Sequence, residues 1–353
     1  MHRAIRPREE TIMTARTAII LAGAALTLPA AAQAAELNLI CAADVVICER
    51  LTEEFGKTHP DISVNMVRMS SGEAYAKIRA ESRNPQTDIW WGGTGDPHLQ
   101  AAADELTTPY ESPMQAELHD WALSQAKVSG NRTVGVYSGV LGWGYNTEHF
   151  AAKGLKEPLC WADLLDPSLK GEIQIADPNS SGTAYTALAT LVQLMGEDEA
   201  FAYLKQLHAN VAQYTKSGSA PVKAAARGEA GLGIVFMHDA VTQQVEGFPI
   251  KPVAPCEGTG YEIGSMSLIE GSPNPDEAKI FYDWVLGADV QSLMPEAGSY
   301  QIASNKAAKA SEHAIDASTV KLIDYDFAEY GSSERRKHLL ARWDAEIGGA
   351  ASE

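Results

Sequence analysis

The sequence lacks the short motifs by which many enzymes and metalloproteins are recognised. It contains no GxSxG nucleophile elbow, no GxxxxGK[ST] phosphate-binding loop, and neither a CxxC nor an HxxxH metal-binding pair. These absences favour a protein that binds its ligand without transforming it, and they indicate neither a metal nor a cofactor.

Basic residues are also scarce. The chain has 28 Lys and Arg against 46 Asp and Glu, which gives a formal net charge of −18. A polyanionic surface repels nucleic acids and anionic lipids, so neither is expected as a partner. If the ligand is an anion, local hydrogen-bond donors must hold it, because the overall field opposes its approach.

Long apolar runs are rare as well. Residues 17–28 (TAIILAGAALTL) form an apolar run that is too short to cross a membrane as a stable helix. The run follows Arg16 and precedes Ala32-Gln33-Ala34, a small-residue cleavage site, and this combination is typical of a secretory signal peptide. We expect cleavage near Ala34–Ala35 and an exported, soluble mature protein.

Strand and helix patterns alternate in the part of the chain that follows the predicted leader. Apolar strand patterns occupy 37–42, 62–69 and 87–91, and amphipathic helix patterns follow the first two. This βαβαβ order predicts an α/β fold with a mostly parallel sheet, whose ligands bind at the carboxyl ends of the strands. The segments expected there are 42–44, 70–72 and 92–95, the last as a sharp glycine-rich loop.

A further set of patterns predicts a second lobe. Strand patterns at 172–176 and 232–236 are each followed by a helix pattern, and glycine-rich stretches at 133–145 and 255–266 are typical of crossing strands. The chain is also longer than one hydrophobic core usually holds. The predicted divisions are a leader at 1–34, lobe 1 at 35–135 and 262–303, lobe 2 at 136–261, and C-terminal helices on lobe 2 at 304–353.

The chain has four cysteines: Cys41, Cys48, Cys160 and Cys256. An even number of cysteines in an exported protein suggests disulfide bonds, and four cysteines allow three pairings. The simplest pairing joins Cys41 to Cys48 and Cys160 to Cys256, because each bond then lies within one predicted lobe. Buried free thiols are the alternative.

Both predicted lobes contain a Ser-Ser-Gly sequence between a strand and a helix, at 70–72 and 180–182. A serine caps the helix and the glycine lets the backbone approach a ligand closely. Free N–H groups and the positive end of the helix dipole then bind an anion without any lysine. An ordinary N-cap is the alternative reading of each sequence.

Three side chains are candidates for binding hydroxyl groups. His238 and Asp239 follow a buried strand pattern, and Glu262 lies in a predicted crossing strand. Carboxylates accept the hydrogens of vicinal diols, as a sugar ligand requires. The structural alternatives make Asp239 an N-cap with His238 packed on it, and Glu262 a solvated hinge carboxylate. Four aromatic residues are candidates either to stack on a sugar ring or to fill the core: Trp90, Trp91, Tyr137 and Trp143.

The stretch from LNLICAADVVICERLTEEFGKTHPDISVNMVRMSSGE to TDIWWGG resembles the first lobe of periplasmic solute-binding proteins of ABC importers, in the ferric-binding (type II) branch. The resemblance extends over nearly all of residues 35–345. It implies two α/β lobes, each with a central sheet, joined by two crossing strands and closing around the ligand. It also implies a periplasmic monomer that delivers its ligand to a permease in the inner membrane.

Iron is not the ligand that this resemblance favours. Ferric-binding members of the branch have a tyrosine pair after the strand that here spans 232–236, whereas this sequence has Met237-His238-Asp239-Ala240. Without phenolates, a site for Fe(III) is poorly supplied. The His-Asp pair and the stretch PCEGTGYEIG are instead similar to the AfuA-type subgroup, whose members bind hexose phosphates.

The AfuA-type resemblance implies ligand-binding roles for nine residues. Sugar hydroxyls would be bound by His238, Asp239 and Glu262. The phosphate would be bound by Ser70, Ser71, Thr94, Ser181, Gly182 and Thr183. The predicted function is therefore capture of a hexose 6-phosphate without catalysis. The alternatives are a ferric ion, a polyamine or thiamine-type cation held by Asp239 and Glu262, and a phosphohydrolase.

Overall fold

The computed structural model describes residues 35–348 of the chain. The predicted signal peptide at 1–34 and the last residues of the predicted C-terminal segment, 349–353, lie outside the described residues.

The strands are β1 (Ala35–Cys41), β2 (Ile62–Arg68), β3 (Ile89–Thr94), β4 (Thr107–Thr108), β5 (Val134–Asn146), β6 (Ile173–Ala176), β7 (Val211–Thr215), β8 (Leu232–Phe236), β9 (Ile250–Val253), β10 (Tyr261–Ile269) and β11 (Ile302–Ala303). The α-helices are α1 (Val45–Thr58), α2 (Ser71–Ala80), α3 (Gly95–Ala103), α4 (Asp120–Ser129), α5 (Thr147–Lys153), α6 (Gly182–Met195), α7 (Glu197–His208), α8 (Ala220–Ala226), α9 (Met237–Val245), α10 (Pro275–Val285), α11 (Ala288–Gln291), α12 (Phe327–Tyr330) and α13 (Ser333–Glu346). Short 3-10 helices occupy Pro113–Glu117, Trp161–Leu165, Pro167–Leu169, Met294–Ala297 and Ala317–Thr319.

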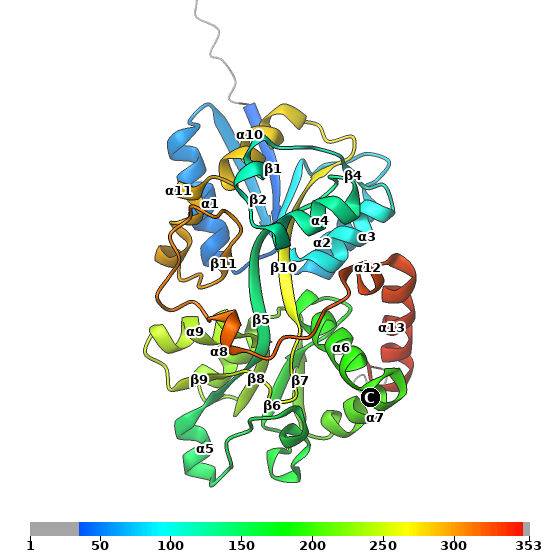
Figure 1. Cartoon of the computed structure of the whole chain (residues 1–353), viewed down its shortest axis with the longest axis vertical. Coiled ribbons are helices and arrows are strands. Elements are labelled where there is room, and N and C mark those ends of the chain that lie inside the picture. Colours follow the sequence, from blue (N-terminus) through cyan, green and yellow to red (C-terminus); the bar gives the residue numbers. More distant parts are fainter. Residues whose placement is uncertain (1–34, 349–353) are drawn as a thin grey trace, which may run out of the picture. The chain divides into compact units, whose positions relative to one another are not determined.

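The described strands form a sheet of 11 strands in the order β2-β1-β3-β10-β5-β8-β6-β7, with β4 beside β10 and with β9 and β11 beside β5. Strands β1, β2 and β3 are parallel, as the alternation of strand and helix patterns predicts. Strand β10 is antiparallel to both β3 and β5. Helices flank the strands (Figure 1), and none within residues 35–348 is long and apolar enough to cross a membrane.

Two large hydrophobic cores lie along this sheet, besides two smaller ones. The first contains Leu39 of β1, Leu51 of α1 and Phe281 of α10, and we call the part of the chain around it lobe 1. The second contains Trp143 of β5 and Phe201 of α7, and we call its surroundings lobe 2. A sheet with two separate cores is the two-lobed α/β architecture that the sequence predicts.

Strand β5 joins the two lobes. It pairs with β10 from Val134 to Val140 and with β8 from Leu141 to Tyr145. Figure 1 shows β5 and β10 as long strands that run from one lobe toward the other. Crossing strands of this kind allow two lobes to close on a ligand by small backbone changes at the strands.

Both disulfides pair as expected, and the alternative of free thiols is wrong for the described cysteines. Cys41 ends β1 and Cys48 lies in α1, so their bond braces the turn between this strand and this helix. The bond between Cys160 and Cys256 joins residues that are 96 positions apart in the chain.

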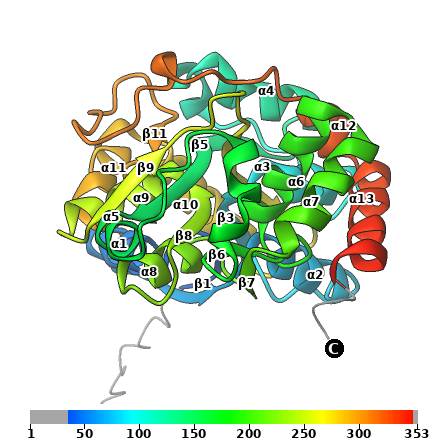
Figure 2. The same cartoon turned by 90° about the horizontal axis from the view of Figure 1, so that it is seen from below.

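The C-terminal helices contact both lobes. Helix α13 packs on α7, with Leu339 and Trp343 in the core of lobe 2 (Figure 2). Helix α12 packs on α3 of lobe 1, and the Ser333 hydroxyl donates to Asp104 Oδ1 at 2.9 Å. Helix α13 therefore packs on lobe 2 and α12 on lobe 1, and the predicted bounds of the lobes stay predictions.

The expectation of a sharp loop at 92–95 is wrong. Gly92 and Gly93 continue strand β3, with φ angles of 78° and 81°, and Thr94 pairs with Gly264 of β10. These positive φ angles strain any residue with a Cβ, so the two glycines let the chain bend while it stays in the strand. Helix α3 begins directly afterwards, at Gly95.

Candidate ligand-binding site

The structure brings all nine predicted ligand residues to one cavity between the lobes. The cavity is small, with a volume of about 60 Å³. The predicted residues in its lining are Ser70, Ser71, Thr94, Ser181, Gly182, Thr183, His238, Asp239 and Glu262. The other residues in its lining are Ala42, Ala43, Arg68, Gly93, Tyr137, Gly218, Ser219, Phe236 and Gln301. Their roles in binding stay predictions.

One end of the cavity is formed by the starts of two helices, α2 from lobe 1 and α6 from lobe 2. Ser70 and Ser181 are the N-cap residues of these helices, so the N-cap reading is correct for both. Ser70 and Ser181 line the cavity although they cap these helices, and Ser71 and Ser181 are buried there. Helix starts present N–H groups and a positive dipole end, which together favour an anion.

The two helix starts are in direct contact. The Gly72 amide donates a hydrogen bond to the Ser180 carbonyl oxygen at 2.9 Å, and the Ser70 hydroxyl donates to the Lys216 carbonyl at 3.1 Å. A Cβ on Gly72 would lie 2.2 Å from the Asn179 carbonyl oxygen, closer than atoms can approach. Glycine at this position is therefore required for the lobes to come together.

Arg68, which the sequence analysis missed, places a guanidinium at the same end. It is the last residue of β2, and its Nε donates to the Ala43 carbonyl at 3.0 Å while Nη2 donates to Ser217 Oγ at 3.3 Å. The expectation of an anion site without a basic side chain is therefore incomplete. The signal was available, because Arg68 stands two residues before the Ser-Ser-Gly sequence at a predicted strand end.

The other end of the cavity is acidic. His238 Nε2 lies 3.6 Å from Asp239 Oδ1 and 3.9 Å from Glu262 Oε1. Both structural alternatives are wrong: helix α9 begins at Met237 after Phe236 as N-cap, so Asp239 does not cap it, and Glu262 is only 4% exposed.

Burial dominates the electrostatics of this acidic end. Burial, reinforced by the negative charge of Asp44, raises the pKa of Asp239 to about 7, although Lys223 and Arg68 oppose this shift. Burial and the Asp239 charge raise the pKa of Glu262 well above its ordinary value. Burial lowers the pKa of His238 to about 3, so the imidazole is neutral at pH 7 despite its two acidic neighbours. These groups therefore accept and donate hydrogen bonds without forming an ion pair.

The aromatic candidates divide between core and cavity. Trp90 and Trp143 are completely buried members of the hydrophobic cores and do not line the cavity, so their core reading is correct. Tyr137 does line the cavity, and its hydroxyl accepts a hydrogen bond from the Gly93 amide at 2.8 Å. Burial raises the pKa of Tyr137 well above its ordinary value, with the charge of Glu262 adding to the shift.

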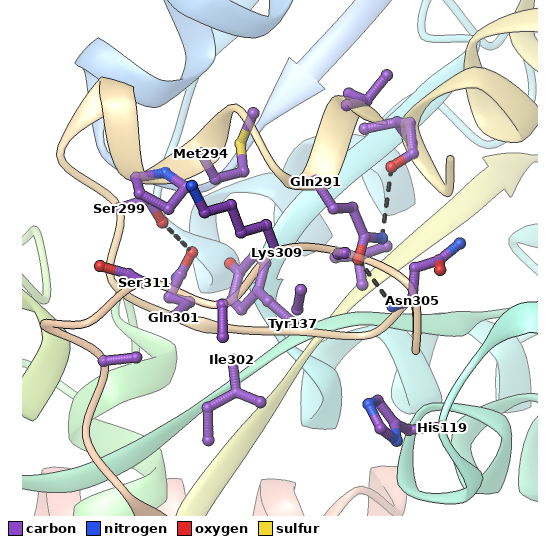
Figure 3. Close-up of a pocket in the computed structure, with 18 of the residues that line it drawn as sticks. His119, Tyr137, Gln291, Met294, Ser299, Gln301, Ile302, Asn305, Lys309 and Ser311 are labelled. Atoms are coloured by element: carbon purple, nitrogen blue, oxygen red, sulfur yellow. Dashed lines mark hydrogen bonds between the residues drawn. The ribbon is translucent and has the colours of Figure 1, made fainter. Parts of the chain in front are cut away.

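A larger and mostly apolar cavity of about 250 Å³ adjoins this site (Figure 3). Its apolar lining includes Val136, Met294 and Ile302, and no Asp or Glu is among the described residues that line it. Tyr137 and Gln301 line both cavities. The larger cavity therefore lacks the acidic groups of the candidate site, while it shares one wall with that site.

Residues 94–330 match the family of bacterial extracellular solute-binding proteins. An uncharacterized protein of Haemophilus influenzae is 47% identical over 337 residues, which cover 95% of this chain and 97% of the relative. The chain belongs to this family. As a solute-binding protein it is the periplasmic component of an ABC importer, with a small-molecule ligand and a membrane permease as its partners.

Solved structures support the same assignment. AfuA from Actinobacillus pleuropneumoniae, solved with exogenous fructose-6-phosphate bound, is 46% identical with a TM-score of 0.86, and the match covers 89% of this solute-binding protein and 99% of AfuA. The periplasmic binding protein P5PA is 42% identical with a TM-score of 0.85, and the match covers 89% of this chain and 99% of the P5PA chain. The resemblance to the AfuA-type subgroup is thus confirmed.

More distant relatives show the fold only. Iron-bound HitA from Pseudomonas aeruginosa is 18% identical with a TM-score of 0.73, over 87% of this chain and 99% of HitA. The spermidine/putrescine-binding periplasmic protein of Escherichia coli is 26% identical over 207 residues, about half of either chain. The type II fold of this solute-binding protein is therefore shared with proteins that bind different ligands.

Proposed function

We propose that this solute-binding protein captures a phosphorylated sugar, a hexose 6-phosphate in particular, and delivers it to its permease. The observation that carries the proposal is that one cavity is lined both by groups that favour an anion and by a cluster of acidic groups. Helix starts, serine hydroxyls and the Arg68 guanidinium lie at one end, and two buried carboxylates with a neutral imidazole lie at the other.

The first end suits a phosphoryl group. Hydrogen bonds to an ionised group are about twice as strong as those between neutral groups, and a guanidinium matches the geometry of phosphate oxygens. Because Ser71 and Ser181 come from different lobes, a phosphate bound to both would hold the lobes together.

The second end suits the hydroxyl groups of a sugar. Asp239 and Glu262 have no lysine or arginine nitrogen within 4.0 Å among the described residues, so their oxygens are available to a ligand. Hydroxyls supply the donors that these buried oxygens need, and a site built to bind hydroxyls rejects a ligand that lacks them. The fructose-6-phosphate bound to AfuA has the same two chemical parts.

A cation of the polyamine or thiamine type is the second candidate. The buried carboxylates of Asp239 and Glu262 favour it, and so does the resemblance to the E. coli spermidine/putrescine-binding protein. Arg68 and the two helix starts oppose it, because they would repel a cation at the other end of the cavity. Iron is less favoured still, since no tyrosine pair follows β8.

Isothermal titration calorimetry tests the proposal. We expect glucose 6-phosphate or fructose 6-phosphate to bind with micromolar or lower Kd, and we expect free glucose, inorganic phosphate and spermidine to bind at least 100-fold more weakly. Replacing Asp239→Ala should abolish sugar-phosphate binding while thermal unfolding stays cooperative. Tight binding of spermidine, or undiminished binding of sugar phosphates by the variant, would overturn the proposal. Release of inorganic phosphate during incubation would instead identify a phosphohydrolase.

A further inference from the structure

Gln301 lies next to a strand that the sequence analysis did not identify, and it contacts His238 of the candidate site. Gln301 immediately precedes β11, which pairs with β5 through Ile302 and Ser138. Its Nε2 lies 3.3 Å from His238 Nε2, and its Oε1 accepts a hydrogen bond from the Ser299 hydroxyl at 2.7 Å. Figure 3 shows this second bond as a dashed line beside Tyr137.

These contacts determine which nitrogen of His238 carries the proton. With its oxygen bonded to Ser299, the amide of Gln301 presents N–H to the imidazole, and an amide nitrogen donates but does not accept. His238 Nε2 must then be the acceptor, and a neutral ring carries its proton on Nδ1. The ring is held in this place because Gly139 leaves room for it: a Cβ on Gly139 would lie 2.5 Å from His238 Nδ1.

We propose that Gln301 is a positioning residue that holds the neutral His238 in the Nδ1–H tautomer, so that Nε2 does not donate to Asp239 or Glu262 and their oxygens stay available to the ligand. An imidazolium carries N–H on both nitrogens, so its Nε2–H would face the N–H of Gln301. Without Gln301, Nε2 would be free to carry the proton and to donate it to the carboxyl oxygens at 3.6 Å and 3.9 Å. That the carboxylates of Asp239 and Glu262 bind sugar hydroxyls rests on the proposed function. The tautomer of His238 is inferred independently of it.

The charged groups around His238 are consistent with this role. Asp44 at the start of α1 favours the protonated ring by its negative charge, and Asp239 on α9 and Glu262 on β10 add to this only above their raised pKa values, where they are ionised. Burial opposes them, and the amide of Gln301 acts in the same direction as burial. Tyr137 adds no charge below its raised pKa.

Long-range ¹H–¹⁵N NMR of histidine-labelled protein distinguishes the tautomers and measures protonation. His98 is an internal reference, because its Nε2 lies 3.1 Å from the Gly92 carbonyl, an acceptor only, and must therefore carry the proton. At pH 7, we expect His98 to give the Nε2–H pattern and His238 the Nδ1–H pattern. Spectra are recorded with and without glucose 6-phosphate, and an Nε2–H or imidazolium pattern for His238 in both conditions would overturn the proposal.

Two variants and one control complete the test. Gln301→Leu should remove the preference for the Nδ1–H tautomer, and Gln301→Glu should raise the pKa of His238, each without changing the His98 signals. Both should weaken glucose 6-phosphate binding about tenfold, the size of one hydrogen bond. The matched control is Gln86→Leu, which makes the same change at an exposed position. If the His238 spectrum is unchanged in Gln301→Leu, the proposal for Gln301 is refuted, even if the ligand binds. If the wild type shows the expected tautomer but binds no sugar phosphate, only the proposed function is refuted.

Discussion

Gly182 of lobe 2 lies against Thr94 of lobe 1 so closely that a Cβ on Gly182 would be 2.0 Å from Thr94 Oγ1. Gly182 is the first residue of helix α6, and its backbone needs no positive φ angle. Its lack of a side chain therefore matters for the approach of the two lobes, while the local conformation would accept alanine.

Replacing Gly182→Ala should weaken ligand binding about tenfold or more, because the added methyl group must be accommodated in the closed contact with Thr94. The free energy of unfolding of the ligand-free protein should change little. Calorimetry and chemical denaturation measure the two quantities. The matched control is Gly56→Ala in α1, where a Cβ would meet nothing within 4 Å. Wild-type affinity in Gly182→Ala would show that closure does not require this contact.

Arg68→Ala should weaken binding of a sugar phosphate about 100-fold, because one charge-assisted contact to the phosphate is lost. Arg68→Lys should give an intermediate affinity, since lysine keeps the charge but cannot reach the Ala43 carbonyl and Ser217 with one planar group. Arg79→Ala on the exposed part of α2 is the control for a general change of charge. Equal effects of Arg68→Ala and Arg79→Ala in calorimetry would argue against a local role.

Asp239→Asn should stabilise the ligand-free protein at alkaline pH. Burial raises the pKa of Asp239 from 3.8 to about 7, so the folded protein binds this proton more tightly than the unfolded chain does. The contribution of Asp239 to the stability of the wild type therefore falls as pH rises from about 4 to about 7 and is constant above that. The asparagine variant should gain on the order of 2 kcal/mol above pH 7 and little near pH 4.

Urea denaturation at pH 4.5 and pH 8 checks this prediction. The pKa of Glu262 is raised as well, so its contribution to stability depends on pH in the same direction. The stability of the variant should therefore depend on pH less than that of the wild type, but still depend on it. Asp61→Asn, at an exposed aspartate, is the control. A variant with the full pH dependence of the wild type would show that Asp239 is ionised at no cost in the folded protein.

The two disulfides should differ in their effect on stability. Chain-entropy estimates give about 2.5 kcal/mol for the short loop closed by Cys41 and Cys48, and about 4.7 kcal/mol for the loop closed by Cys160 and Cys256. Paired Cys→Ser variants compared by urea denaturation measure the difference. Loss of the first bond should also weaken ligand binding, because it braces the turn that contains Ala42 and Ala43 of the cavity lining. A larger loss of stability from the first pair would contradict this ranking.

The local patterns of the sequence predicted the presence of the strands and helices that carry the site more accurately than the residues at which these elements end. Strand β3 was expected to stop at Trp91, because two glycines normally mark a turn, yet it continues to Thr94. Pairing with Gly264 of β10 outweighs the local tendency of the glycines, and this partner lies far away in the chain. The sequence predicted a serine-capped helix start at each Ser-Ser-Gly sequence, and α2 and α6 begin there, at Ser71 and Gly182, since capping is a local interaction.

Gln301 shows where prediction from the sequence ends. Nothing in the stretch Ser299-Tyr300-Gln301 indicates a binding function, and β11 is only two residues long. The role that we infer for Gln301 depends on His238, which is 63 residues away and reaches it from another element.

The order of residues along the chain was enough to indicate two α/β lobes, two disulfides, and serine-capped helix starts, because each depends on neighbours or on simple periodicity. Folding alone decided that Gly182 meets Thr94, that Arg68 joins the serines, and that burial keeps His238 neutral beside two acids. These contacts join distant residues across two lobes. They are set by how the cores and the crossing strands pack, which no local pattern of residues specifies.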